Sequence, residues 1–146
     1  MQKRWLFAVV PVMLLGADTA KDDAVKKELE KFQGTWQLVS AETDGKKAPE
    51  DRVKQTRVVI KGSKHSVYFV DKAVVHEIPF AIDPTTSPKS VTDTLPDGKT
   101  IKSIYELDGD TLKSCAAAVG KDRPKEFSAK EGTGQTLWVF KRVMMK

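Results

Sequence analysis

Cysteine and asparagine are scarce in this sequence, and each scarcity excludes a class of protein. Cys115 is the only cysteine, so an internal disulfide is excluded and the chain is unlike small, cysteine-dense secreted scaffolds. The absence of asparagine leaves no N-glycosylation acceptor. The fold must therefore be stable through packing, and 146 residues, 40% of them hydrophobic, suffice for one domain with one core.

Charge of one sign is not concentrated anywhere along the chain. The formal net charge is +5, and the lysines are spread over the whole length without a basic run that interleaves with aromatic residues. Nucleic acid is therefore not expected as a partner.

Patterns of catalytic residues are also missing. The sequence contains no nucleophile elbow, no histidine pair on a helix and no cysteine–histidine arrangement. Ser66 adjoins His65, but neighbouring strand residues point to opposite faces and cannot form a nucleophile–base pair. The sequence therefore offers no support for an enzyme, and no cofactor is predicted.

The first twenty residues differ from the rest. Lys3 and Arg4 precede an apolar run from Trp5 to Leu15, which is too short to span a bilayer, and small residues follow it up to Ala20. This pattern is typical of a secretory signal peptide, with cleavage after Ala17 or Ala20. We expect residues 1–20 to be removed and residues 21–146 to form a secreted or periplasmic domain without a membrane span.

Hydrophobic periodicity predicts one helix followed by strands only. Residues 22–32 read as a short helix, since Val25, Leu29 and Phe32 recur on one face and Gly34 ends it. Beyond Gly34 the period changes to two, turn residues recur about every ten positions, and no further helix is expected. The predicted strands are 35–43, 55–61, 65–70, 73–82, 89–94, 99–107, 111–117 and 135–142.

Eight sequential strands joined mostly by tight turns favour an antiparallel up-and-down barrel. Closure removes exposed strand edges, and a barrel of eight strands can enclose one small ligand. A sandwich with Greek-key crossings is the structural alternative. The longest connection, 119–134, is the natural place for a lid or a contact loop, or else an ordinary solvated loop.

The segment Gln33-Gly34-Thr35-Trp36 follows the predicted helix, and Lys141-Arg142 ends the last predicted strand. This order is similar to that of lipocalins and the wider calycin group, in which the tryptophan packs at the closed end of the barrel beneath a basic residue of the last strand. The resemblance implies that Gly34, Trp36 and Arg142 close the barrel.

More of the chain carries a second resemblance. From Phe32 to Arg142 it resembles an uncharacterised lipocalin-like domain family of planctomycetes, through the segments QGTW, DGKKAPED, VVIKG, IDPTTSPK, YELDGDTLK, DRPKEF and GQTLWVFKR. That family has no established activity, so the resemblance implies a fold but very little about function. The chain lacks the Thr-Asp-Tyr motif and the cysteine pair of well-studied lipocalins.

The segment 65–82 reads as a hairpin with Asp71-Lys72 as its two-residue turn. Alternation then divides the hairpin into two faces, and the more apolar face is predicted to point inward. Its residues are His65, Val67, Phe69, Val74, His76, Ile78, Phe80 and Ile82. His65 and His76 at this spacing could hold half of a zinc or copper site or contact a haem, with Tyr105, Glu42 or Cys115 as third ligand. The alternative, which we favour, is that each histidine is a polar lining residue of a cavity, or lies near its rim and meets water.

The same alternation assigns further inward faces: Trp36, Leu38, Ser40 and Glu42; Ile101, Ser103, Tyr105 and Leu107; Trp138, Phe140 and Arg142. We predict a pocket for a small hydrophobic or amphipathic molecule, lined by Leu38, Phe69, His76, Phe80, Tyr105 and Trp138. The alternative is a filled barrel that acts as a protein-interaction module. It would bind an exported partner through loops 44–52 and 121–131, including Arg123 and Glu126.

Overall fold

The computed structural model describes residues 15–144, and the side chains from residue 19 onward. Most of the predicted signal peptide, residues 1–14, lies outside the described residues. The elements are α1 (Leu15–Phe32), β1 (Gly34–Thr43), β2 (Lys46–Lys47), α2 (Glu50–Lys54), β3 (Thr56–Lys61), β4 (Lys64–Phe69), β5 (Lys72–Asp83), β6 (Lys89–Thr94), β7 (Thr100–Asp108), β8 (Thr111–Ala116) and β9 (Thr136–Arg142).

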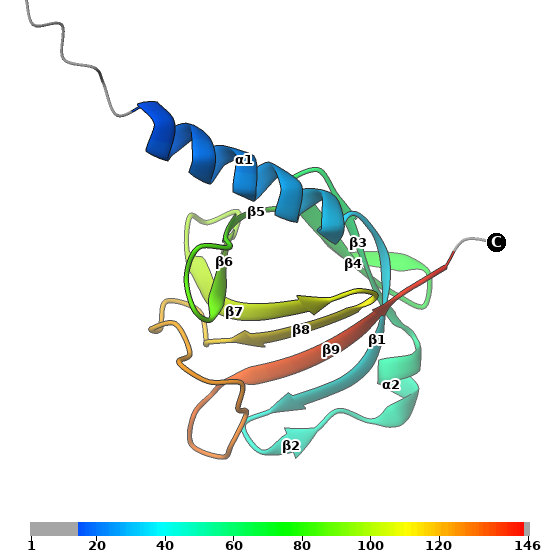
Figure 1. The fold of residues 1–146 in the computed structure, drawn as a ribbon. Coiled ribbons are helices and arrows are strands. Elements are labelled where there is room, and N and C mark those ends of the chain that lie inside the picture. Colours follow the sequence, from blue (N-terminus) through cyan, green and yellow to red (C-terminus); the bar gives the residue numbers. More distant parts are fainter. Residues whose placement is uncertain (1–14, 145–146) are drawn as a thin grey trace, which may run out of the picture.

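The strands form a closed antiparallel barrel (Figure 1). Each of the strands from β3 to β8 pairs with the next along the chain, and β1 pairs with β3. The pairing of β1 with β9, from Trp36↔Arg142 to Thr43↔Thr136, closes the barrel. The predicted eight-stranded up-and-down barrel is confirmed, and the sandwich is excluded. The two-residue strand β2 is an addition on the edge of β1.

The helix α2 was not expected from the sequence. Glu50 and Asp51 lie in its first turn and Arg52 and Lys54 in its last, which complements the helix dipole. Val53 is its one buried side chain. The prediction of a single helix is therefore wrong. Periodicity could not reveal α2, because five residues are too few to show a helical repeat.

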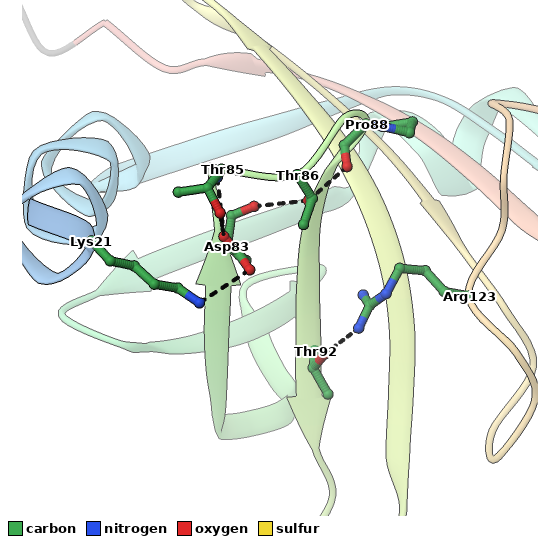
Figure 2. A network of polar contacts seen from close by, with 7 residues as sticks. All are labelled: Lys21, Asp83, Thr85, Thr86, Pro88, Thr92 and Arg123. Carbon is green, nitrogen blue, oxygen red and sulfur yellow. Dashed lines mark hydrogen bonds and ion pairs between the residues drawn. The ribbon is translucent and has the colours of Figure 1, made fainter. Parts of the chain in front are cut away.

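The helix α1 lies across one end of the barrel (Figure 1). Val25, Leu29 and Phe32 pack against the barrel core, as the predicted helical face required, although the helix begins at Leu15 and not at residue 22. The buried Glu28 carboxylate of this helix lies 3.2 Å from Lys89 Nζ on β6. Near its start, Lys21 Nζ lies 3.5 Å from Asp83 Oδ2, the contact drawn in Figure 2.

Trp36 and Arg142 form the closed end beneath this helix. The Trp36 side chain is fully buried, its Nε1–H donates to Phe32 O at 2.8 Å, and the Arg142 guanidinium carbon lies 4.3 Å from the indole centroid. At Gly34, with φ 122°, a Cβ would lie 3.3 Å from Arg142 Nη1. This is the arrangement that the lipocalin resemblance implied, and it explains why glycine stands at residue 34.

The hairpin between β4 and β5 differs from the predicted register. Its turn is Val70-Asp71, with φ 48° and 62°, so Phe69 pairs with Lys72 and Tyr68 with Ala73. Two register shifts follow, and beyond them His65↔Ile78 and Lys64↔Pro79 have the register that the predicted turn would give. A turn of this kind needs positive φ at both central residues, and valine rarely adopts positive φ. For this reason the sequence favoured a turn at Asp71-Lys72, one residue after the observed turn.

A bulge in β1 produces a second difference. The pairing with β9 shifts between Leu38 and Ser40, and beyond it Ala41 packs against the core. Ser40 is exposed, and Ser40 and Glu42 border a groove beneath α2 on the outer side of β1. The prediction that Ser40 and Glu42 share the inward face of Trp36 and Leu38 is therefore wrong, because one extra residue reverses the alternation.

Candidate functional site

The barrel encloses a cavity of about 220 Å³. Every one of the eight barrel strands contributes side chains to its wall, and Phe32 at the end of α1 closes one side. The lining residues are Phe32, Leu38, Thr56, Val58, Ile60, His65, Val67, Phe80, Val91, Asp93, Ser103, Tyr105, Leu112, Ser114, Trp138 and Phe140. Most of these side chains are aliphatic or aromatic, so an apolar molecule is the natural occupant.

A second pocket, of about 450 Å³, adjoins the first. It shares Leu38, Thr56, Val67 and Trp138 with the inner cavity. Its other walls come from α2, the β4–β5 hairpin and the ends of β1 and β9: Ala41, Thr43, Ala48, Arg52, Phe69, Val74 and Thr136. The shared residues make this outer pocket the natural approach to the inner cavity.

His65 and Asp93 lie together in the wall of the inner cavity, whose other polar side chains are Thr56, Ser103, Ser114 and Tyr105. His65 Nε2 lies 3.3 Å from Asp93 Oδ1, and both side chains are 21% exposed. Phe80 lies beside them, since it pairs directly with Asp93 across β5 and β6 and its ring centroid is 5.8 Å from that of His65. The cavity therefore combines aromatic walls with one carboxylate and one imidazole.

Tyr105 contributes its ring to the same cavity. The ring meets Phe32 edge-on with a centroid distance of 4.9 Å. Its hydroxyl is the one buried side-chain oxygen or nitrogen without a hydrogen-bond partner in the part of the chain that the structure describes. Burial, with the negative charges of Glu28 and Asp83, raises the pKa of Tyr105, so the side chain stays neutral at physiological pH.

The residues predicted to line the cavity divide into three groups. Leu38, Phe80, Tyr105 and Trp138 line the inner cavity, and Phe69 lines the outer pocket. His76 is exposed and borders neither, because the two register shifts in β5 turn it away from the face of His65.

Asp93 was missed as a site residue from sequence. It lies on a correctly predicted strand, and the alternation of Val91 and Asp93 would have placed both on one face.

The proposed half-site for a metal is not assembled. His65 lines the cavity, whereas His76 lies on the outside. Cys115 is buried against the loop after β8, where its Sγ donates to Ser128 O at 3.3 Å and burial raises the pKa of its thiol. Within residues 15–144 no three histidine, cysteine, aspartate or glutamate side chains gather where they could hold one ion.

The loop between β8 and β9 is held against the barrel. Arg123 Nη1 donates to Val91 O at 2.7 Å and to Ser103 O at 2.6 Å. Its Nη2 donates to Thr92 Oγ1 at 2.8 Å, the bond drawn in Figure 2. The guanidinium proposed for partner recognition is thus used inside the molecule, whereas Glu126 is exposed.

The same loop covers a small apolar area on the outer face of β7 and β8. Ile104 and Cys115 are almost fully buried there although they do not line the cavity, and the loop itself buries Pro124 and Ala129. Asp44 Oδ1 accepts hydrogen bonds from the backbone N–H groups of Gly132 and Gly134 further along the loop. These contacts hold the loop between β8 and β9 against the barrel, so it is not an open lid.

Comparison of the chain with protein-family models, with curated proteins and with solved structures found no match. In residues 15–144 no helix has the length and apolar character needed to cross a bilayer. The geometry defines the class of molecule: a closed eight-stranded barrel with a mostly apolar cavity that contains a carboxylate–imidazole pair.

Proposed function

We propose that this protein binds a small hydrophobic or amphipathic molecule inside its barrel. The observation that carries the proposal is the cavity of about 220 Å³ to which all eight barrel strands contribute. Drug-sized ligands occupy pockets of about 300–1,000 Å³, so the inner cavity suits a smaller molecule, or one that extends into the adjoining outer pocket.

Packing supports an occupant. Protein interiors are filled to the density of organic crystals, and an unfilled apolar cavity costs stability because its lining side chains lose contacts. The lining includes Leu38, Phe80 and Trp138. These side chains are large, and in other rotamers they could fill the interior of the barrel. A bound molecule would restore those contacts.

We also propose that the protein is exported. The basic residues Lys3 and Arg4, the apolar run up to Leu15 and the small residues before Lys21 support this. Among the described side chains of α1, those of residues 19–32, the ones that pack on the barrel core begin at Val25, so cleavage after Ala17 or Ala20 would leave that packing in place. Mass spectrometry of the exported protein should give a chain that starts at Asp18 or Lys21; an intact chain would contradict the export proposal.

Isothermal titration with phenylpropanol tests the binding proposal. This molecule is small, mostly apolar and carries one hydroxyl, so it matches the lining of the cavity. We expect saturable binding to the wild-type protein at one site per chain. Leu38→Trp should abolish it, because Leu38 lines both pockets and the larger ring would occupy the space.

Val39→Trp is the matched control. Val39 is the neighbouring residue, is 46% exposed and borders only the groove beneath α2. This variant should bind like the wild type. Binding that survives in Leu38→Trp, or that is lost equally in both variants, would contradict a site inside the barrel.

A further inference from the structure

The charged groups of the inner cavity bear on which molecules it accepts. Among the side chains that the structure describes, Asp93 is the only carboxylate in the cavity wall, and no lysine or arginine lines it. The imidazole of His65 lies beside this carboxylate, and the raised pKa of Tyr105 keeps that phenol neutral. The Asp93 carboxylate can therefore accept hydrogen bonds from a ligand, and can pair with a positively charged group, inside mostly apolar walls.

The contact between His65 and Asp93 restricts the carboxylate. His65 Nε2 lies 3.3 Å from Asp93 Oδ1, so the imidazole limits the positions that the Asp93 side chain can take. Within residues 15–144 the second oxygen of Asp93, Oδ2, has no hydrogen-bond partner and can accept a bond from a ligand.

Aromatic walls add to this preference. Phe80 lies beside His65, and Tyr105 and Trp138 line the same space. Aromatic faces attract cations, and a cation that leaves water for an apolar cavity needs a partner of opposite charge. An anion would instead be repelled by the Asp93 carboxylate, and the inner wall contains no lysine or arginine to balance it.

We propose that the inner cavity selects molecules with an apolar body and a cationic amine, with Asp93 as the partner of the amine nitrogen and His65 as the residue that orients Asp93. This inference rests on the proposed binding function and names the class of ligand for the same site. Arg52 in the outer pocket is the competing anchor, since it would hold the head of an anionic molecule whose tail entered the cavity.

Three compounds with the same phenyl ring and three-carbon chain separate these cases: phenylpropylamine, phenylpropanol and phenylpropionate. Titration calorimetry at one fixed neutral pH should give the amine an affinity about tenfold higher than that of the alcohol, the effect of one charge-assisted hydrogen bond. The carboxylate should bind more weakly than the alcohol.

The variant Asp93→Asn should remove the preference for the amine, so that the amine and the alcohol bind to this variant with similar affinity. His65→Gln should reduce the preference without abolishing it. Glu106→Gln is the control, because Glu106 is exposed on β7, does not line the cavity, and the variant changes net charge by the same amount.

The outcomes separate the two proposals. If none of the three compounds binds, the proposed binding function fails. If all three bind with equal affinity, or the amine keeps its advantage in Asp93→Asn, the cavity binds small molecules but the amine inference is wrong. Tightest binding of the carboxylate would also overturn it and would assign the head group to Arg52.

Discussion

Among single residues, Arg142 joins separate parts of the chain at the closed end of the barrel. Its guanidinium donates to the carbonyl oxygens of Gln33 and Lys31 and to the Asp110 carboxylate, while its flat face covers Trp36. Only a planar group with several donors in fixed directions can make these contacts together. The end of β9 is thereby fastened to the end of α1 and to the β7–β8 turn.

We therefore expect Arg142→Lys to lower the free energy of unfolding by about 1–3 kcal/mol, since lysine keeps the charge but loses the fork of donors. Urea unfolding followed by tryptophan fluorescence measures this. Lys141→Ala is the control, because Lys141 is exposed on the same strand and should change stability by less than about 0.5 kcal/mol. Equal changes in both variants would show that Arg142 does not fasten the barrel end.

Tyr105 predicts a pH dependence. Burial and the nearby charges of Glu28 and Asp83 raise its pKa above the ordinary value of about 10. Above that pH the unfolded chain loses the phenolic proton while the folded chain keeps it. The stability that this group contributes is therefore complete below about pH 10 and is lost as the pH rises.

The variant Tyr105→Phe should accordingly lose stability less steeply than the wild type at alkaline pH. At neutral pH it should be about 1 kcal/mol more stable, because the buried hydroxyl without a partner is removed. Urea unfolding over a series of pH values measures both effects. A loss of stability at neutral pH would mean that the hydroxyl has a partner in solution.

Among the strands and loops, the anchored β8–β9 connection carries the clearest prediction. Arg123 supplies the donors for Val91 O and Ser103 O, and the loop backbone adds a bond from the Gly120 N–H to Thr100 O. Arg123→Ala should speed amide hydrogen exchange in residues 117–135 by about tenfold and leave the barrel strands protected.

The control for this experiment is Lys125→Ala, which removes an exposed charge from the same loop. It should leave exchange unchanged. If Arg123→Ala also leaves the loop protected, the backbone bonds and buried residues of the loop hold it without the guanidinium.

Strand positions could be predicted from sequence because alternation and turn residues are local signals. No predicted end of a barrel strand differs from the observed one by more than one residue; β3 and β9 are examples. The bulges could not be predicted, since an extra residue leaves the composition unchanged and only reverses the faces beyond it. That reversal is why Phe80 was placed correctly and His76 was not.

For the molecule as a whole, closure of the barrel was predictable and the open interior was not. Eight strands in meander order, with a tryptophan near one end and an arginine near the other, favour a closed barrel. Whether its inside is filled depends on how side chains from all eight strands fit together, which no single segment specifies. The pairing of His65 with Asp93 likewise depends on residues 28 positions apart meeting inside the barrel.

The most direct measurement for the binding proposal is a crystal structure of the protein soaked with phenylpropanol. The account predicts electron density for the ring inside the barrel, in contact with Leu38, Phe80 and Trp138. An interior filled by side chains, with density for the compound only on the outer surface or nowhere, would contradict it.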